Sequence, residues 1–554
     1  MRQFAVAFLV SLGAVLAASG PGCADSKAPV FTAAGVGGSV EQPLEDRIVP
    51  APGGARRLLA RQYIGSVRAV FGDAAAAVAT PPKELALHGF SSIGAAELAL
   101  SPPDVEAFEA SARAIAKAVV GDPAGLAALL PCQPTGPTDG ACFASFVAKT
   151  GRRLWRRPLQ PSEVGVIGGI ATQAGVAYDS VDKALSYALI ALLQAPDFLY
   201  LVEVGEADVA TPERRRLTGT ELASRMAFFL GDAPPDEALL DAADAGELDS
   251  DEGMRSAAEA LLARPEARAA LGSFYDEVFR FGLLDVTVKN NELFPEWTPA
   301  LQTSIHASVR AFLDDLVWTA NADARTMLTA SHAFVDANLA PLYGVSVPAS
   351  AGLVKVTLPT EQQRMGLLGS AAFLSVFSHA AMTSPTKRGV FIRRTILCDS
   401  VPPPPAAVTP QLPDDPAGAL TKKDLLAQHV KDENCRTCHA AFDSLGLSLE
   451  NFDTIGRYRT TDNGIPIDTS GDSANVGTFN GPRELGELLA ESYKAPDCMV
   501  RNLFRNSMGH LETKGEEPAI DDLHQRFEAR GFKVRELLVE IVASPAFRLV
   551  GEPK

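Results

Sequence analysis

The stretch Glu433-Asn434-Cys435-Arg436-Thr437-Cys438-His439 contains a Cys-x-x-Cys-His motif. Two cysteines one helical turn apart can each bond to a vinyl group of a haem, and the histidine that follows them can ligate the iron. With seven cysteines and eight histidines in 554 residues, chance would place this motif in roughly one such chain in a thousand. The motif therefore predicts one covalently bound haem c, attached through Cys435 and Cys438, with His439 as the proximal iron ligand.

Two other uses of the motif are open. Cys435 and Cys438 could form a structural or redox-active disulfide, or half of a zinc site. A zinc site needs further ligands at similar spacing, and the sequence has no second Cys-x-x-Cys to supply them. Redox chemistry of the thioredoxin type would require a strand leading into the motif, and none is evident. Haem attachment is the favoured interpretation, and the disulfide is the alternative.

Covalent haem attachment requires export, which the N-terminus favours. Arg2 is followed by an apolar run from Phe4 to Ala17, too short to span a bilayer, as in a cleaved signal peptide over residues 1–22. Cys23 lies where a lipid-modified cysteine would begin a mature lipoprotein, and cleavage without a lipid is the alternative. We therefore expect a periplasmic or cell-envelope protein that contacts the membrane through this anchor only.

The remaining cysteines suit an oxidising compartment. Cys132 and Cys142 enclose a short loop rich in Pro, Gly and Thr, which favours a local disulfide between them. By elimination, Cys398 and Cys498 would then pair on either side of the haem motif. The sequence alone does not prove either connectivity.

Composition excludes some classes of partner. A formal net charge of −17 argues against nucleic-acid binding, because neutralising phosphates needs clustered Lys and Arg. It also argues against electrostatic docking on anionic lipid. The redox partner protein or small-molecule substrate is not identified by any motif.

The hydrophobic pattern predicts a mostly α fold, in which a multi-helical N-terminal region is followed by a small cytochrome-c-like helical haem domain. Thr218 and Glu221 predict a capping box at a helix start, whereas Val354 to Leu358 is one of the few strand-like alternations. For the stretch from Thr383 to Gly389 the sequence predicts only a helix cap and a turn. The expected organisation is a flexible tether at 23–54, helical domains at 55–205 and 206–360, a connector with a polyproline linker at 361–415, and the haem domain with C-terminal helices at 416–554.

Other haem contacts are predicted downstream of the motif. Arg457 and Arg459 are the nearest basic residues that could pair with the haem propionates. Met508 is the favoured sixth iron ligand because it shares an apolar stripe with Val500 and Phe504. Met499 and His510 are alternatives, and an empty sixth position would favour peroxidase or oxygen chemistry.

Several motifs in order resemble one family of exported multi-domain proteins. They are Arg56-Arg57-Leu58, Arg156-Arg157-Pro158-Leu159, Ala195-Pro196-Asp197-Phe198-Leu199-Tyr200, Ser384-Pro385 with Arg388-Gly389, and the haem motif followed by Leu449-Glu450-Asn451-Phe452-Asp453. This family, abundant in planctomycetes and myxobacteria, is known only as serial domains of unknown function with an embedded cytochrome-c-like motif. The resemblance covers nearly all of the mature chain and implies haem c and an extracytoplasmic site, but no substrate. Family members often carry arginine at the position of His510, and this departure keeps His510 as an alternative ligand.

The sequence thus predicts electron transfer or haem-dependent oxidoreduction on an unidentified substrate. The alternative function is an extracytoplasmic binding or scaffold lipoprotein in which Cys435 and Cys438 form a disulfide. No nucleophile elbow, phosphate-binding loop or paired-carboxylate motif supports hydrolysis.

Overall fold

The computed structural model describes residues 42–208, 211, 214–402, 420–431 and 433–553. The chain divides into two units, Met1–Gln42 and Pro43–Lys554. Three predicted features lie outside the described residues: the signal peptide, the lipid anchor at Cys23 and most of the polyproline linker. No helix among the described residues combines the length and the apolar character that crossing a membrane requires.

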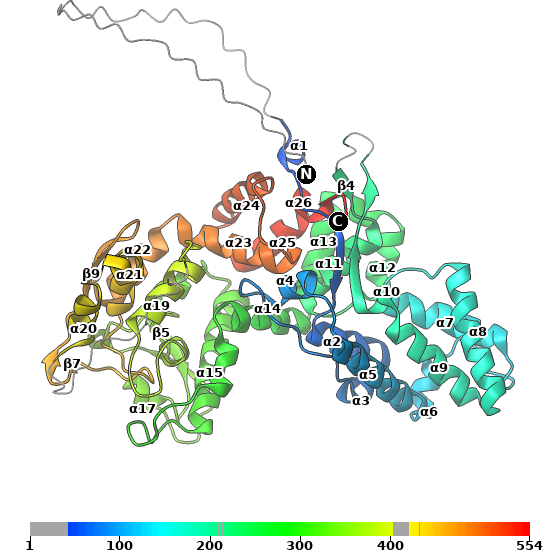
Figure 1. Cartoon of the computed structure of the whole chain (residues 1–554), viewed down its shortest axis with the longest axis horizontal. Helices are drawn as coiled ribbons and strands as arrows, with labels where there is room; N and C mark the ends of the chain where they lie inside the picture. Colours follow the sequence, from blue (N-terminus) through cyan, green and yellow to red (C-terminus); the bar gives the residue numbers. More distant parts are fainter. Residues whose placement is uncertain (1–41, 209–210, 212–213, 403–419, 432, 554) are drawn as a thin grey trace, which may run out of the picture. The chain divides into compact units, whose positions relative to one another are not determined.

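The prediction of a mostly helical fold is confirmed (Figure 1). Up to residue 200 the helices are α1(Leu44–Arg47), α2(Ala60–Phe71), α3(Asp73–Ala77), α4(Ser91–Glu97), α5(Pro102–Val120), α6(Pro123–Leu129), α7(Gly140–Trp155), α8(Pro161–Tyr178), α9(Val181–Gln194) and α10(Pro196–Leu199). The middle of the chain forms α11(Gly219–Gly231), α12(Glu237–Asp244), η1(Glu247–Asp249), α13(Asp251–Leu262), α14(Pro265–Val278), η2(Phe281–Val286), α15(Pro299–Asp314), η3(Asp315–Thr319), α16(Thr326–Thr329), α17(Ala340–Tyr343), η4(Thr360–Gln362), α18(Ala371–Val376), α19(Pro385–Phe391) and η5(Ile392–Ile396). The last part forms α20(Lys422–His429), α21(Glu433–Leu447), α22(Gly481–Glu491), α23(Lys494–Met508), α24(Glu517–Ala529), α25(Val534–Ala543) and α26(Pro545–Arg548).

The strands are short and pair antiparallel. The sheets are β1(Gly54–Arg57) with β2(Tyr200–Glu203), β5(His332–Val335) with β6(Val354–Thr357), β7(Thr461–Asp462) with β8(Ile465–Pro466), β9(Ser470–Ser473) with β10(Gly477–Asn480), and β4(Arg214–Arg216) between β3(Glu206–Ala207) and β11(Leu549–Gly551). The predicted strand near Val354 is β6. Pairing of β11 with β4 brings the C-terminal end of the chain to the start of its middle part (Figure 1).

Two hydrophobic cores lie within Pro43–Lys554. The first joins the helices between residues 58 and 201, with Phe146, Leu189 and Phe198 fully buried in it. Phe228 of α11 also belongs to this core, which therefore extends beyond the range 55–205 predicted for the first helical domain. Ser180 caps the start of α9 by accepting a hydrogen bond from the Lys183 amide, and α9 then packs against α5, α7 and α8.

The second core extends through the rest of the chain and includes residues on both sides of position 416, where the haem domain was predicted to begin. Its buried residues include Met226 and Phe373 as well as Leu445 and Leu537. The amphipathic helices after residue 416 bury their apolar faces against earlier helices, since α21 packs on α19 and α25 packs on α13. The predicted connector at 361–415 is likewise part of this core wherever the structure describes it, through residues such as Phe391 and Ile392.

The described end of the predicted tether is folded. The Val49 amide donates a hydrogen bond to the Gly515 carbonyl at 2.9 Å, and the Gly551 amide donates to the Ala51 carbonyl at 2.7 Å. Ile48 is buried in the second core. Residues 43–54 thus differ from the predicted flexible tether because C-terminal segments bond to them, and residues 23–41 lie outside the described residues.

Two disulfides, Cys132–Cys142 and Cys398–Cys498, link the four cysteines as the sequence suggested. The first spans a sequence separation of 10 residues and the second a separation of 100. Because the second joins the segment just after η5 to α23, which is distant in sequence, it restricts the unfolded chain far more than the first.

We expect the Cys398→Ser/Cys498→Ser double variant to lose about 4–5 kcal/mol of unfolding free energy, from the closure entropy of the longer loop. The Cys132→Ser/Cys142→Ser variant is the matched control and should lose only about 2–3 kcal/mol. Guanidinium unfolding under non-reducing conditions measures both losses. Equal losses in the two variants would contradict the loop-length argument.

Candidate functional site

Helix α21 carries the Cys-x-x-Cys-His motif. Cys435, Cys438 and His439 occur at positions i, i+3 and i+4 of one continuous helix, so that they lie on one side of it. Cys435 is buried and Cys438 is half-buried, and both are free thiols. The structure therefore does not form the alternative disulfide between them.

The His439 imidazole is held from one side by a carboxylate. Its Nδ1 lies 2.8 Å from Oδ2 of Asp443, one helical turn further along α21. Because an ionised carboxylate only accepts hydrogen bonds, Nδ1 carries the proton in this pair. Nε2 has no hydrogen-bond partner among the described residues, so the unprotonated nitrogen remains available to a metal.

Asp443 is itself fixed by a neighbouring helix. Its Oδ1 accepts a hydrogen bond of 2.9 Å from Oγ1 of Thr386 in α19, and the Asp443 side chain is almost fully buried. A hydrogen-bonded chain thus runs from Thr386 through Asp443 to His439. Outer partners of this kind set the tautomer and ring orientation of a histidine ligand.

Helices α19 and α21 are in backbone contact. A Cβ atom on Gly446 would lie 1.8 Å from the Pro385 carbonyl oxygen, and one on Gly389 would lie 1.9 Å from the Phe442 carbonyl oxygen. Only glycine permits this approach at both positions. The contact brings Thr386 within reach of Asp443.

Arg388 anchors the segment that follows α21. Its side chain is fully buried, and it donates hydrogen bonds to the carbonyl oxygens of Leu449 at 3.0 Å and Phe452 at 3.2 Å. It also forms an ion pair with Glu450 at 3.4 Å. Burial lowers the pKa of Arg388 to about 10 and raises the pKa of Glu450 above its usual value.

Sequence reasoning missed these roles of the stretch from Thr383 to Gly389, for which it predicted only capping and a turn. Ser384 does cap α19, by accepting a hydrogen bond from the Lys387 amide. The sequence signal for these roles is an arginine next to a glycine at the start of a helix, with apolar residues around them. An arginine that is buried needs several hydrogen-bond acceptors, so this pattern predicts a structural role for Arg388.

The predicted propionate ligands are already paired with carboxylates. Arg457 forms an ion pair with Glu296, and Arg459 forms ion pairs with Glu450 at 2.9 Å and Asp462 at 2.7 Å. The structure thus gives both arginines protein partners, and their contact with haem propionates stays a prediction.

Two of the predicted sixth ligands, Met508 and His510, have polar protein partners in the structure. The Met508 sulfur lies 3.7 Å from Nη1 of Arg225 in α11, which donates to it. His510 Nε2 lies 3.0 Å from Oε1 of Glu516. The prediction assumed that the C-terminal helices close over α21, whereas α23 packs mainly against α4, α22, α24 and η5.

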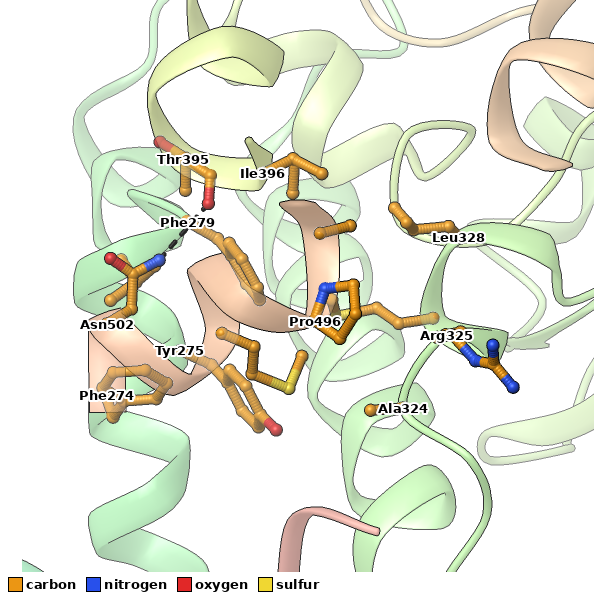
Figure 2. Close-up of a pocket in the computed structure, with 14 residues that line it drawn as sticks. Phe274, Tyr275, Phe279, Ala324, Arg325, Leu328, Thr395, Ile396, Pro496 and Asn502 are labelled. Carbon is orange, nitrogen blue, oxygen red and sulfur yellow. Dashed lines mark hydrogen bonds between the residues drawn. The ribbon is translucent and has the colours of Figure 1, made fainter. Parts of the chain in front are cut away.

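Met499 lines a small apolar cavity of about 30 Å³ between α14, η5 and α23. Figure 2 shows this cavity, with the aromatic rings of Phe274, Tyr275 and Phe279 and a hydrogen bond of 3.3 Å from Asn502 Nδ2 to the Thr395 carbonyl. The volume is close to that of one water molecule, which is far too small for a porphyrin.

Metal binding by several side chains is not indicated elsewhere. No group of three or more His, Cys, Asp and Glu residues in the described part of the chain is arranged to hold a metal ion. A haem iron needs only His439 from the motif, because the porphyrin supplies four nitrogen ligands.

Comparison with known families identifies serial domains. Five family models, each described as a protein of unknown function, match the chain in succession: DUF1587 at 56–121, DUF1595 at 142–203, DUF1592 at 217–345, DUF1588 at 364–462 and DUF1585 at 477–547. The DUF1588 match includes both α19 and α21, so the predicted boundary at 415/416 falls inside a single family segment. Searches of curated proteins and of solved structures gave no match. The chain is a multi-domain protein built from serial domains of unknown function.

Proposed function

We propose that this chain of serial domains of unknown function is an exported c-type haem protein that transfers electrons or oxidises or reduces a substrate. The observation that supports the proposal most is the arrangement of two free thiols and a carboxylate-held imidazole on one side of α21. When bound, the haem would supply one-electron exchange at its iron. Export and an anchor at Cys23 are parts of the same proposal and rest on the N-terminal sequence.

Each residue of the site would have a defined task. Cys435 and Cys438 would form the thioethers, and His439 would present Nε2 to the iron. Asp443 would keep the proton on Nδ1 and orient the ring. Thr386 would hold Asp443 in place from α19.

Covalent attachment is tested with protein purified from the envelope of a host that matures c-type haem. The denatured wild-type chain should retain haem stain and give a pyridine haemochrome band. Cys435→Ala combined with Cys438→Ala should lose both completely, since no thioether remains. The Cys132→Ala/Cys142→Ala variant removes two distant cysteines and should keep both signals. A wild-type sample without Soret absorbance would refute the proposal.

A second prediction concerns Asp443. In Asp443→Asn, haem should remain attached, but the midpoint potential should rise because a neutral partner makes the His439 ligand less basic and the ferric state less stable. Spectroelectrochemical titration measures the potential. Asp472→Asn, at an exposed position in β9, is the control. An unchanged potential in Asp443→Asn would show that this carboxylate does not tune the iron.

A further inference from the structure

A cavity of about 930 Å³ is built from segments that are distant from one another in the sequence. The stretch from His88 to Phe90 lines it together with the end of α14, the start of η2, one face of α19 and η5, and the later part of α23. These segments belong to four of the five serial domains. Pockets that bind small molecules occur preferentially where domains meet, and this volume is near the upper end of their usual range.

One face of the continuous helix formed by α19 and η5 is a wall of the cavity. Lys387, Val390, Phe391 and Arg394 all line it, and their spacing of three, four and seven residues places them on one side of a helix. The wall therefore presents two apolar side chains between two cations, which are about 10 Å apart along the helix axis. Other elements add the apolar side chains of Phe90, Val278 and Phe377.

Three cations of the lining, Arg280, Lys387 and Arg394, lack acidic partners. All three are exposed, and within the described ranges none of them forms an ion pair. In the same part of the chain, Lys387 Nζ has one polar contact, with His379 Nδ1 at 3.3 Å, and Arg394 donates to the Val401 carbonyl. Burial lowers the pKa of Lys387 below its usual value, as expected for an ammonium group that no carboxylate offsets.

The remaining charged groups of the lining already have partners. Asp399 forms ion pairs with Arg393 and Lys494, and Arg505 forms one with Glu512 at 2.6 Å. The Glu277 carboxylate accepts a hydrogen bond from the Ser91 amide. In a chain of net charge −17, three unpaired cations beside apolar side chains favour an acidic ligand with an apolar body.

The backbone around the cavity has an uncommon conformation at three points. His88, Arg280 and Cys398 have left-handed backbone, with φ of 52°, 59° and 51°, although none of them is glycine. Such residues cost folding free energy and cluster at active sites and ligand-binding sites. Cys398 is also bonded to Cys498 of α23, so a covalent link holds two of the lining segments together.

We infer that this cavity binds a small organic acid, whose apolar body lies along α19 and η5 and whose acidic group pairs with the three unpaired cations. The described residues that line the cavity include none of Cys435, Cys438 and His439. The ligand is therefore a molecule separate from the haem of the proposed function. The inference goes beyond that function and does not depend on it, because it rests on the cavity alone.

Equilibrium dialysis of the full-length protein with a matched pair of probes tests the inference. The probes are 8-anilinonaphthalene-1-sulfonate and N-phenyl-1-naphthylamine, which share one aromatic body and differ by the anionic group. Lys387→Gln combined with Arg394→Gln should weaken binding of the sulfonate about tenfold, because two favourable charge interactions are lost. Binding of the neutral probe should not change. The control is Arg113→Gln/Lys117→Gln, which removes the same charge at exposed positions of α5 and should leave both probes unaffected.

A second pair of variants adds a negative charge instead of removing positive ones. Leu283 lines the cavity and is 45% exposed, so Leu283→Glu should fold and should weaken sulfonate binding severalfold through repulsion. Val286 belongs to the same short helix but does not line the cavity, and it is 71% exposed. Val286→Glu is therefore the matched control and should bind the sulfonate as the wild type does.

The outcomes distinguish this inference from the proposed function. Cys435→Ala/Cys438→Ala cannot attach haem and should bind the sulfonate with wild-type affinity, whereas loss of binding in that variant would place the probe at α21 and overturn the inference. Equal sulfonate binding by wild type and Lys387→Gln/Arg394→Gln would also overturn it, as would equal weakening of both probes. None of these results changes whether the wild type carries haem.

Discussion

Replacing Gly446 with alanine is expected to destabilise the protein by roughly 3 kcal/mol or more, at the upper end of the cost of overpacking. The new Cβ would lie 1.8 Å from the Pro385 carbonyl oxygen and 2.5 Å from its carbonyl carbon. These are backbone atoms at the start of α19, so no side-chain rotation can relieve the clash, and α19 and α21 must separate. Separation would also break the hydrogen bond between Thr386 and Asp443.

Denaturant unfolding followed by circular dichroism measures the loss. Gly165→Ala in α8 is the matched control, because an added Cβ there meets no atom within 4 Å and the position is exposed. That substitution should stabilise the helix by roughly 0.5–1 kcal/mol. A Gly446→Ala variant as stable as the wild type would show that the two helices are not packed backbone to backbone.

Replacing Arg388 with methionine is expected to cost about 3–5 kcal/mol, as when one partner of a buried ion pair is removed. The methionine fills part of the volume but removes the Arg388 donor from Oε1 of Glu450 and from the carbonyl oxygens of Leu449 and Phe452. Arg459 still pairs with Oε2 of Glu450. Arg436→Met is the control. Arg436 is exposed on α21, and its only acceptors among the described residues are the Val430 and Lys431 carbonyls, both at 3.3 Å. Its loss should therefore change the unfolding free energy by less than about 0.5 kcal/mol.

The loss of unfolding free energy in Arg388→Met should depend on pH. Burial raises the pKa of Glu450 in the folded protein, and loss of Arg388 raises it further because Arg388 favours the carboxylate. A folded state that binds the proton more tightly than the unfolded state loses stability as pH rises above the ordinary glutamate pKa. The deficit relative to wild type should therefore be larger at pH 8 than at pH 5. Unfolding at both pH values measures it, and an equal deficit would argue against a charged Glu450 as the source.

Local patterns in the sequence were sufficient to predict several features of the structure. The capping box at Thr218 and Glu221 forms as predicted, with the Glu221 carboxylate 2.8 Å from both the amide and the hydroxyl of Thr218. The spacing of Cys435, Cys438 and His439 placed them on one side of a helix. Such features involve residues within one or two helical turns, where chain geometry alone sets the neighbours.

The sequence did not reveal which elements the C-terminal helices pack against. Met508 was correctly placed on an apolar stripe, but nothing in the periodicity tells which element covers that stripe. In the structure Arg225 of α11 contacts Met508, although it lies more than 280 residues earlier in the chain. An apolar stripe specifies burial and not the identity of the neighbour.

By itself, the sequence determined that the protein is mostly helical and that a Cys-x-x-Cys-His motif presents its thiols and imidazole together. It favoured two disulfides among four other cysteines without proving them. Only the tertiary structure decided that Thr386 holds Asp443, the partner of His439, that Arg388 supports the segment after α21, and that Arg457 and Arg459 are bound to protein carboxylates. The physical reason is the separation along the sequence of the residues that make each contact. Contacts within a helix follow from the repeating backbone geometry. Contacts between helices depend on how all the apolar faces of the chain are buried together in the core.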